Sequence, residues 1–144
     1  MKGDELQSGD HVARYCKPSS VQDDLPTVTA FEIKEAGGHL SVNWLEYFAE
    51  AESQSPCELI PSVRDAFLKK GFTLRPSGRF AVLSVGLSTQ RIASAQDRTV
   101  SFLHWPEDDD ESHSGIFGYG PDDLAIRLEL KNLVTTENVF AAAP

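Results

Sequence analysis

Residues 79–105 read RFAVLSVGLSTQRIASAQDRTVSFLHW, and this stretch decides the fold class. Arg79 to Gly86 is a dense apolar run after a Pro-Ser-Gly turn, which is typical of a strand covered on both faces. Ser88 to Gln96 is predicted to form a short helix, and Thr99 to Trp105 a further strand. A strand, a helix and a strand in this order predict helices packed on a sheet, with a crossover between the two strands.

Three further strands are predicted upstream of this stretch. His11 to Cys16 (HVARYC) is β-prone and ends before Pro18, which cannot donate to a strand ladder. Thr27 to Lys34 and His39 to Leu45 flank a Gly-Gly pair, and this arrangement predicts a hairpin. Residues 17–26 are rich in turn formers, so we expect an exposed loop between the first strand and the hairpin.

A helix is predicted between Pro56 and Gly71. The apolar residues of this segment recur with the spacing of one helix face: Leu59, Val63, Ala66 and Phe67. Gly71 is a stop signal. Because Pro61 has no amide hydrogen to donate, the regular helix is expected to begin nearer Ser62.

The remaining segments complete the predicted domain. Residues 107–120 are expected to form a loop, residues 121–134 a helix, and residues 135–144 a C-terminal tail. The whole pattern predicts an α+β or α/β domain over residues 11–134, with a flexible N-terminal segment at residues 1–10. Its sheet is expected to be mixed and to have about five strands, with two to three helices packed on it.

Composition limits the class of protein. The chain has 144 residues, of which 40% are hydrophobic and 24% charged, a balance that supports one folded core. Residues 1–10 are polar and carry no export signal, and the longest apolar run is far shorter than the roughly 20 residues of a membrane helix. Cys16 and Cys57 form no metal or disulfide motif. We therefore expect a cytoplasmic protein with no cofactor and no membrane partner.

Charge is unevenly distributed along the chain. The net charge is −9, but residues 62–98 hold seven basic and two acidic residues, so this segment carries +5 and the rest −14. The acidic excess argues against a nucleic-acid partner. A separated acidic surface predicts a protein partner with a basic surface, and a homodimer is compatible with it. Alternatively, the basic residues fold back beside the acidic ones and leave an ordinary surface.

Histidine chemistry suggests a catalytic site. His113 is the strongest candidate for a general base, because small polar residues flank it and a neutral imidazole accepts a proton near neutral pH. Further catalytic candidates lie on the strand at residues 11–16 and in the segment at residues 40–48: His11, Asn43 and Glu46. The substrate-binding candidates are Arg14, Arg79 and Trp44. Strand alternation puts His11 and Arg14 on opposite faces, so one strand cannot direct both into one pocket.

Two features keep alternative interpretations open. Residues 104–114 (HWPEDDDESHS) offer ligands for a divalent cation, although their spacing matches no EF-hand, and a solvated acidic loop is the alternative. Cys57 stands at a helix start, where the helix dipole favours a reactive thiolate, whereas a buried structural thiol is the alternative.

Two functions from different classes fit these observations. The first is a non-catalytic binding or regulatory protein that acts through its charged surface, since no motif specifies a reaction. The second is a small enzyme acting on a nucleotide-like or other anionic substrate, with His113 as base and an arginine binding the anion. A concave pocket around His113 would favour the enzyme.

Overall fold

The centre of the sheet is β1 (His11–Cys16), which pairs along its whole length with β5 (Arg79–Ser84). The computed structural model describes residues 2–143, so Met1 and Pro144 of the predicted terminal segments lie outside it. The other strands of the sheet are β4 (Leu40–Trp44), β6 (Ser101–His104), β7 (His113–Phe117) and β8 (Val139–Ala141). The strand order is β6-β7-β4-β1-β5-β8, and the pairings between these strands are antiparallel.

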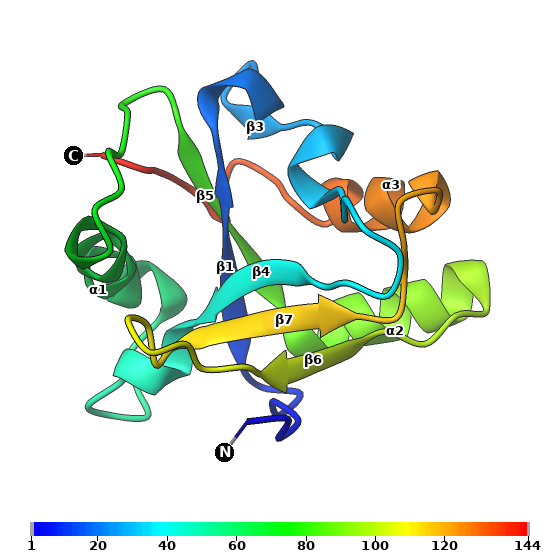
Figure 1. Ribbon diagram of the computed structural model, residues 1–144, viewed down its shortest axis with the longest axis horizontal. Coiled ribbons are helices and arrows are strands. Elements are labelled where there is room, and N and C mark those ends of the chain that lie inside the picture. The colour runs from blue at the N-terminus through cyan, green and yellow to red at the C-terminus, as the bar shows by residue number, and fades with distance from the viewer. Residues whose placement is uncertain (1, 144) are drawn as a thin grey trace.

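Helices cover both faces of this sheet (Figure 1). α1 (Pro56–Lys69) packs on one face, and α2 (Val85–Gln96) and α3 (Leu124–Asn132) pack on the opposite face. Short elements connect the strands: the 3-10 helices η1 (Pro18–Ser20), η2 (Val28–Phe31) and η3 (Leu45–Phe48), and the strands β2 (Val21–Gln22) and β3 (Leu25–Pro26). Within residues 2–143, no helix has the length and apolar character needed to span a bilayer.

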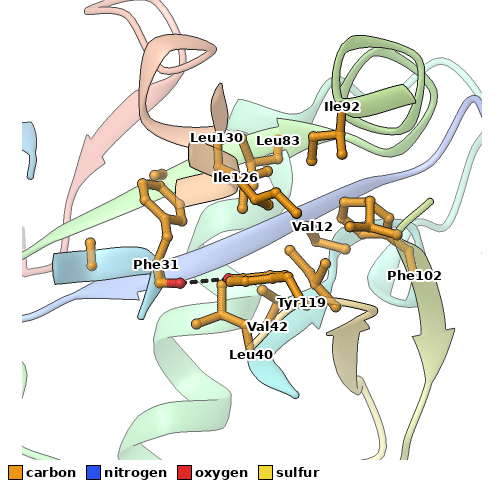
Figure 2. Packing of buried hydrophobic residues seen from close by; sticks show 14 of the residues in the cluster. Val12, Phe31, Leu40, Val42, Leu83, Ile92, Phe102, Tyr119, Ile126 and Leu130 are labelled. Carbon is orange, nitrogen blue, oxygen red and sulfur yellow. Dashed lines mark hydrogen bonds between the residues drawn. The ribbon is translucent and has the colours of Figure 1, made fainter. Parts of the chain in front are cut away.

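Strand alternation divides the buried residues into two cores. Val12 of β1 and Leu83 of β5 face α2 and α3, and Figure 2 shows them packed with Ile92, Ile126 and Leu130. In the same core, the Tyr119 hydroxyl donates a 2.5 Å hydrogen bond to the Phe31 carbonyl oxygen, which ties η2 to the segment before α3. The neighbouring residues of β1 and β5 point the other way and pack under α1.

The α+β class with helices packed on a sheet is confirmed. The predicted strands at residues 11–16, 39–45, 79–86 and 99–105 correspond to β1, β4, β5 and β6, and the three predicted helices are present. α1 begins at Pro56 rather than near Ser62, because Ser55 and Glu58 form a capping box that stabilises the first turn ahead of Pro61.

The predicted hairpin of residues 27–34 and 39–45 is wrong. Residues 28–31 form η2, in which the adjacent residues Ala30 and Phe31 are both buried. Consecutive burial suits a helical turn and not a half-buried strand, in which alternate residues face the core. The predicted crossover is present, because α2 joins β5 to β6 and these two strands run in the same direction, with β1, β4 and β7 between them.

Two strands of the main sheet, and the short β2–β3 pair within residues 17–26, were not predicted. β7 lies within the segment expected to be a loop, and β8 lies within the C-terminal tail, so the sheet has six strands instead of about five. β7 contains Gly115, where a Cβ atom would stand 2.7 Å from the His39 ring, so the sheet needs glycine at this position. The N-terminal segment also joins the sheet, since the Leu6 amide donates to the Phe102 carbonyl oxygen of β6 at 2.9 Å.

Candidate functional site

A cleft of about 580 Å³ lies on the face of the sheet that α1 covers in part. It exists because β1 and β4 pair at only two positions, Val12 with Trp44 and Ala13 with Asn43. Beyond these pairs the ladder ends and the cleft begins. Its lining includes two residues that the sequence singled out as catalytic, Asn43 and His113, and one singled out for substrate binding, Arg14.

Arg14 bridges the opening between the strands. Its Nε donates to the Ala30 carbonyl oxygen at 2.7 Å, and its Nη1 donates to the Ser41 carbonyl oxygen at 2.9 Å. Partial burial lowers the pKa of Arg14 from its ordinary value. No carboxylate among residues 2–143 forms an ion pair with it. The cleft is therefore lined by a half-buried cation that forms no ion pair with an acid within residues 2–143.

His113 is buried, with 4% of its surface exposed, yet it lines the same cleft. Its Nδ1 lies 2.7 Å from the Trp105 carbonyl oxygen, and because a carbonyl only accepts, Nδ1 carries the proton. The other ring nitrogen, Nε2, is then the proton acceptor of the neutral ring and lies 3.8 Å from Oε1 of Glu107. This arrangement fits the predicted general base.

A second imidazole lies beside His113. The ring of His39 is 5.8 Å from that of His113, centroid to centroid. Burial and the neighbouring His113 lower the pKa of His39, whereas Glu107 raises it. The net effect lowers the pKa of His39, which favours its neutral ring. The carboxylate that faces His113 is that of Glu107.

A buried polar network holds the loop that leads into His113. Asn43 Nδ2 donates to Asp110 Oδ2 and to Ser112 Oγ, both at 2.8 Å, and Lys70 Nζ lies 2.8 Å from Asp110 Oδ2. Burial opposes the ionisation of Asp110, but Lys70, Ser112 and Asn43 outweigh it and lower the pKa of Asp110. Asn43 thus positions the loop, and both hydrogens of its amide nitrogen are used in doing so.

Aromatic rings form one wall of the cleft. Tyr15, Phe67 and Phe72 line it, and Phe72 is 50% exposed. The Phe67 and Phe72 rings meet edge to face at 5.2 Å, and the Lys70 ammonium lies 4.5 Å from the Phe67 ring centroid. An exposed ring beside cations can stack against a flat group of a ligand.

The structure brings only part of the predicted site together. His11 and Glu46 lie away from the cleft and contact each other, with His11 Nδ1 donating to Glu46 Oε2 at 2.8 Å. Trp44 points to the other face of the sheet, where it packs against the core. Arg79 lies 2.8 Å from the Asp24 carboxylate, at the edge near β3.

The acidic loop divides into buried and exposed parts. Asp110 is buried in the network, and the four neighbouring acids are exposed: Glu107, Asp108, Asp109 and Glu111. Across the described residues, no three His, Cys, Asp or Glu side chains gather as metal ligands would.

The separation of charge along the sequence is partly cancelled in space. Four basic residues of the segment 62–98 form ion pairs with acids from outside it: Lys70, Arg79, Arg91 and Arg98. These contacts correspond to the interpretation in which basic residues fold back beside acidic ones.

Sequence reasoning missed several residues of the cleft, among them Tyr15, Lys70 and Asp110. Alternation places Tyr15 and Arg14 on opposite faces of β1, and both line the cleft because β1 and β4 separate beyond Ala13. Lys70 and Asp110 are 40 residues apart, and no local pattern connects them.

Compared with protein-family models, curated proteins and solved structures, the chain matches none of them.

Proposed function

We propose that the protein is a small enzyme that binds a nucleotide-like anionic molecule in this cleft, with Arg14 binding the anion and His113 accepting a proton. The observation that carries the proposal is the half-buried Arg14 guanidinium, which has two carbonyl partners and no ion pair with a carboxylate among residues 2–143. A partly buried cation without a carboxylate partner favours an anionic ligand, because charge-assisted hydrogen bonds are the strong ones.

The remaining contacts of the cleft suit such a ligand. Lys17 and Lys34 also line the cleft and add positive charge, while the aromatic wall offers a surface for a base. Glu32, Glu107 and Asp109 line it as well, so the anionic group is expected at Arg14, with which no carboxylate of residues 2–143 forms an ion pair.

His113 supplies the reactive group. With Nδ1–H bound to the Trp105 carbonyl oxygen, Nε2 is available to take a proton from water or from a ligand hydroxyl. The imidazolium that forms would be stabilised by Glu107 at 3.8 Å, and general-base catalysis of this kind contributes about 100- to 10,000-fold in rate.

Calorimetric titration with adenosine monophosphate, inorganic phosphate and uncharged adenosine tests the binding step. The monophosphate should bind more tightly than adenosine, and Arg14→Gln should weaken its binding by at least about tenfold through loss of a charge-assisted contact. Arg75→Gln is the matched control, because Arg75 is exposed and lies outside the cleft.

Turnover separates the two roles. Release of phosphate from a panel of nucleotides should fall by about 100-fold or more in His113→Gln, while binding stays within a few-fold of the parent chain. Equal binding by the parent chain and by Arg14→Gln, with unchanged circular dichroism, would contradict the proposal.

A second candidate function rests on the exposed acids at residues 107–111. In this alternative the protein regulates a basic partner through that surface, without catalysis. Neutralising Glu107, Asp108, Asp109 and Glu111 together should then remove a partner captured from native cytosol. Asp110 is left unchanged in this variant, because it belongs to the buried network. Capture of the same partners by both chains would exclude this function.

A further inference from the structure

A second cavity, of about 300 Å³, lies where the first turns of α1 and α2 approach the end of β5. β8 pairs only with residues 79–81 of β5, so no strand of the sheet pairs with residues 82–84 on that edge. The cavity occupies this place. His11, Cys57 and Ser88 line it, and none of them belongs to the cleft of the proposed function.

Ser88 shows that the cavity has an unmet hydrogen-bonding group. The residue is fully buried on α2, and its Oγ has no hydrogen-bond partner among the described residues. A buried hydroxyl is ordinarily bonded, in a helix most often to the carbonyl oxygen one turn earlier. Its position in the cavity lining therefore points to a ligand that has a polar group to pair with it.

Cys57 supplies a nucleophile at the rim. It is exposed, contrary to the alternative of a buried structural thiol, and it is the second residue of α1. Its backbone amide precedes the helical hydrogen bonds, so the thiol stands in the first turn of α1, beside the cavity.

His11 and Glu46 provide the base. Glu46 holds both the His11 backbone amide, at 2.6 Å, and the ring Nδ1, at 2.8 Å. Burial opposes ionisation of Glu46, but the hydrogen bonds from His11 outweigh it and lower the pKa of Glu46, so the carboxylate accepts the Nδ1 proton. His11 Nε2 is then the free proton acceptor, and Cys57 lines the same cavity, so the three residues supply the nucleophile, base and orienting acid that thiol enzymes use.

We propose that this cavity is a thiol acyl-transfer site, in which Cys57 takes an acyl group from an ester or thioester. The Cys57 proton passes to His11 Nε2, directly or through one water, and the thiolate forms a carbon–sulfur bond with the acyl carbon. The bond between that carbon and the leaving group breaks, and the leaving group takes the proton from His11. The acyl chain lies along the apolar wall, which includes Leu133, Phe140 and the 62% exposed Leu87.

Incubation of the full chain with p-nitrophenyl butyrate, followed by mass spectrometry, tests this site. The same measurement with a butyryl thioester compares the acylation rates that the ester and the thioester donor give. Cys57 should be acylated at least about 100-fold faster in the parent chain than in His11→Ala. Added imidazole should restore part of the rate in His11→Ala but not in Glu46→Gln, because Glu46 is a positioning residue. A purely structural role of His11 would give no such rescue.

Two variants of α2 test the cavity itself. Ser88→Ala should slow acylation several-fold, whereas Ser94→Ala, at an exposed position of the same helix, should not. Leu87→Ser should reduce the preference for butyrate over acetate.

Acylation of Cys57 no faster than that of free N-acetylcysteine, or equally fast in parent and His11→Ala chains, would overturn the proposal. Neither outcome bears on nucleotide binding at Arg14, so the two proposals fail separately.

Discussion

A buried ion pair anchors the loop that carries His113. Lys70 and Asp110 are 10% and 2% exposed at the side chain, and Asn43 and Ser112 complete the hydrogen bonds of the carboxylate. Removing one partner of such a pair leaves the other charge buried without compensation, which is more costly than the loss of the attraction alone.

Asp110→Asn should therefore lower the free energy of unfolding by about 3–5 kcal/mol, measured by urea denaturation. Asp108→Asn, at an exposed position of the same loop, should stay within about 0.5 kcal/mol of the parent chain. Equal stability of the two variants would show that the pair does not anchor the loop.

The same carboxylate predicts a pH dependence. The folded protein lowers the pKa of Asp110, so its ionised form is favoured in the folded state. Its contribution to stability is present above the unfolded pKa of about 4 and is lost as pH falls through the lower folded pKa. Between about pH 5 and pH 2, the stability of Asp110→Asn should fall less steeply than that of the parent chain, as followed by thermal denaturation. Parallel curves would contradict this assignment.

At the scale of elements, α1 carries an unusual residue. Pro61 lies inside the helix and is exposed, so its ring removes a helical hydrogen bond without filling a core. Pro61→Ala should raise the free energy of unfolding by about 1–3 kcal/mol. Pro56→Ala, at the first helical position, where proline suits the helix, should not stabilise the protein. A lower midpoint of urea denaturation for Pro61→Ala would contradict this expectation.

Elements with a strong local pattern were predictable, and elements defined by distant partners were not. β1, β5 and α1 have apolar residues at the spacing of their structure, so the sequence alone indicates them. β7 consists of His, Ser, Gly, Ile and Phe and is a strand because β4 and β6 pair with it on both sides. η2 resembles a strand in composition, but its burial is that of a turn.

At the scale of the whole molecule, long-range pairing determined what the sequence could reveal of the site. His113 and Asn43 were predicted as candidates separately, and they meet because β4 and β7 pair directly at these two residues. Arg14 joins them only because β1 and β4 separate after two pairs. His11 and Glu46 were also predicted together, but His11 lines the second cavity, and Glu46 is bound to its ring there. Residue chemistry thus indicated the candidate site residues, while the strand order divided them between the cleft and the second cavity.

The account depends most on the claim that the cleft binds an anion at Arg14. The most direct measurement is a titration of ¹⁵N-labelled protein with adenosine monophosphate, following the Arg14 Nε–H resonance and the backbone amides by NMR. We predict saturable shifts at Arg14, Ser41 and His113, all of which line the cleft. An Arg14 side-chain resonance that does not move while the nucleotide binds elsewhere, or the absence of any saturable shift, would contradict the claim.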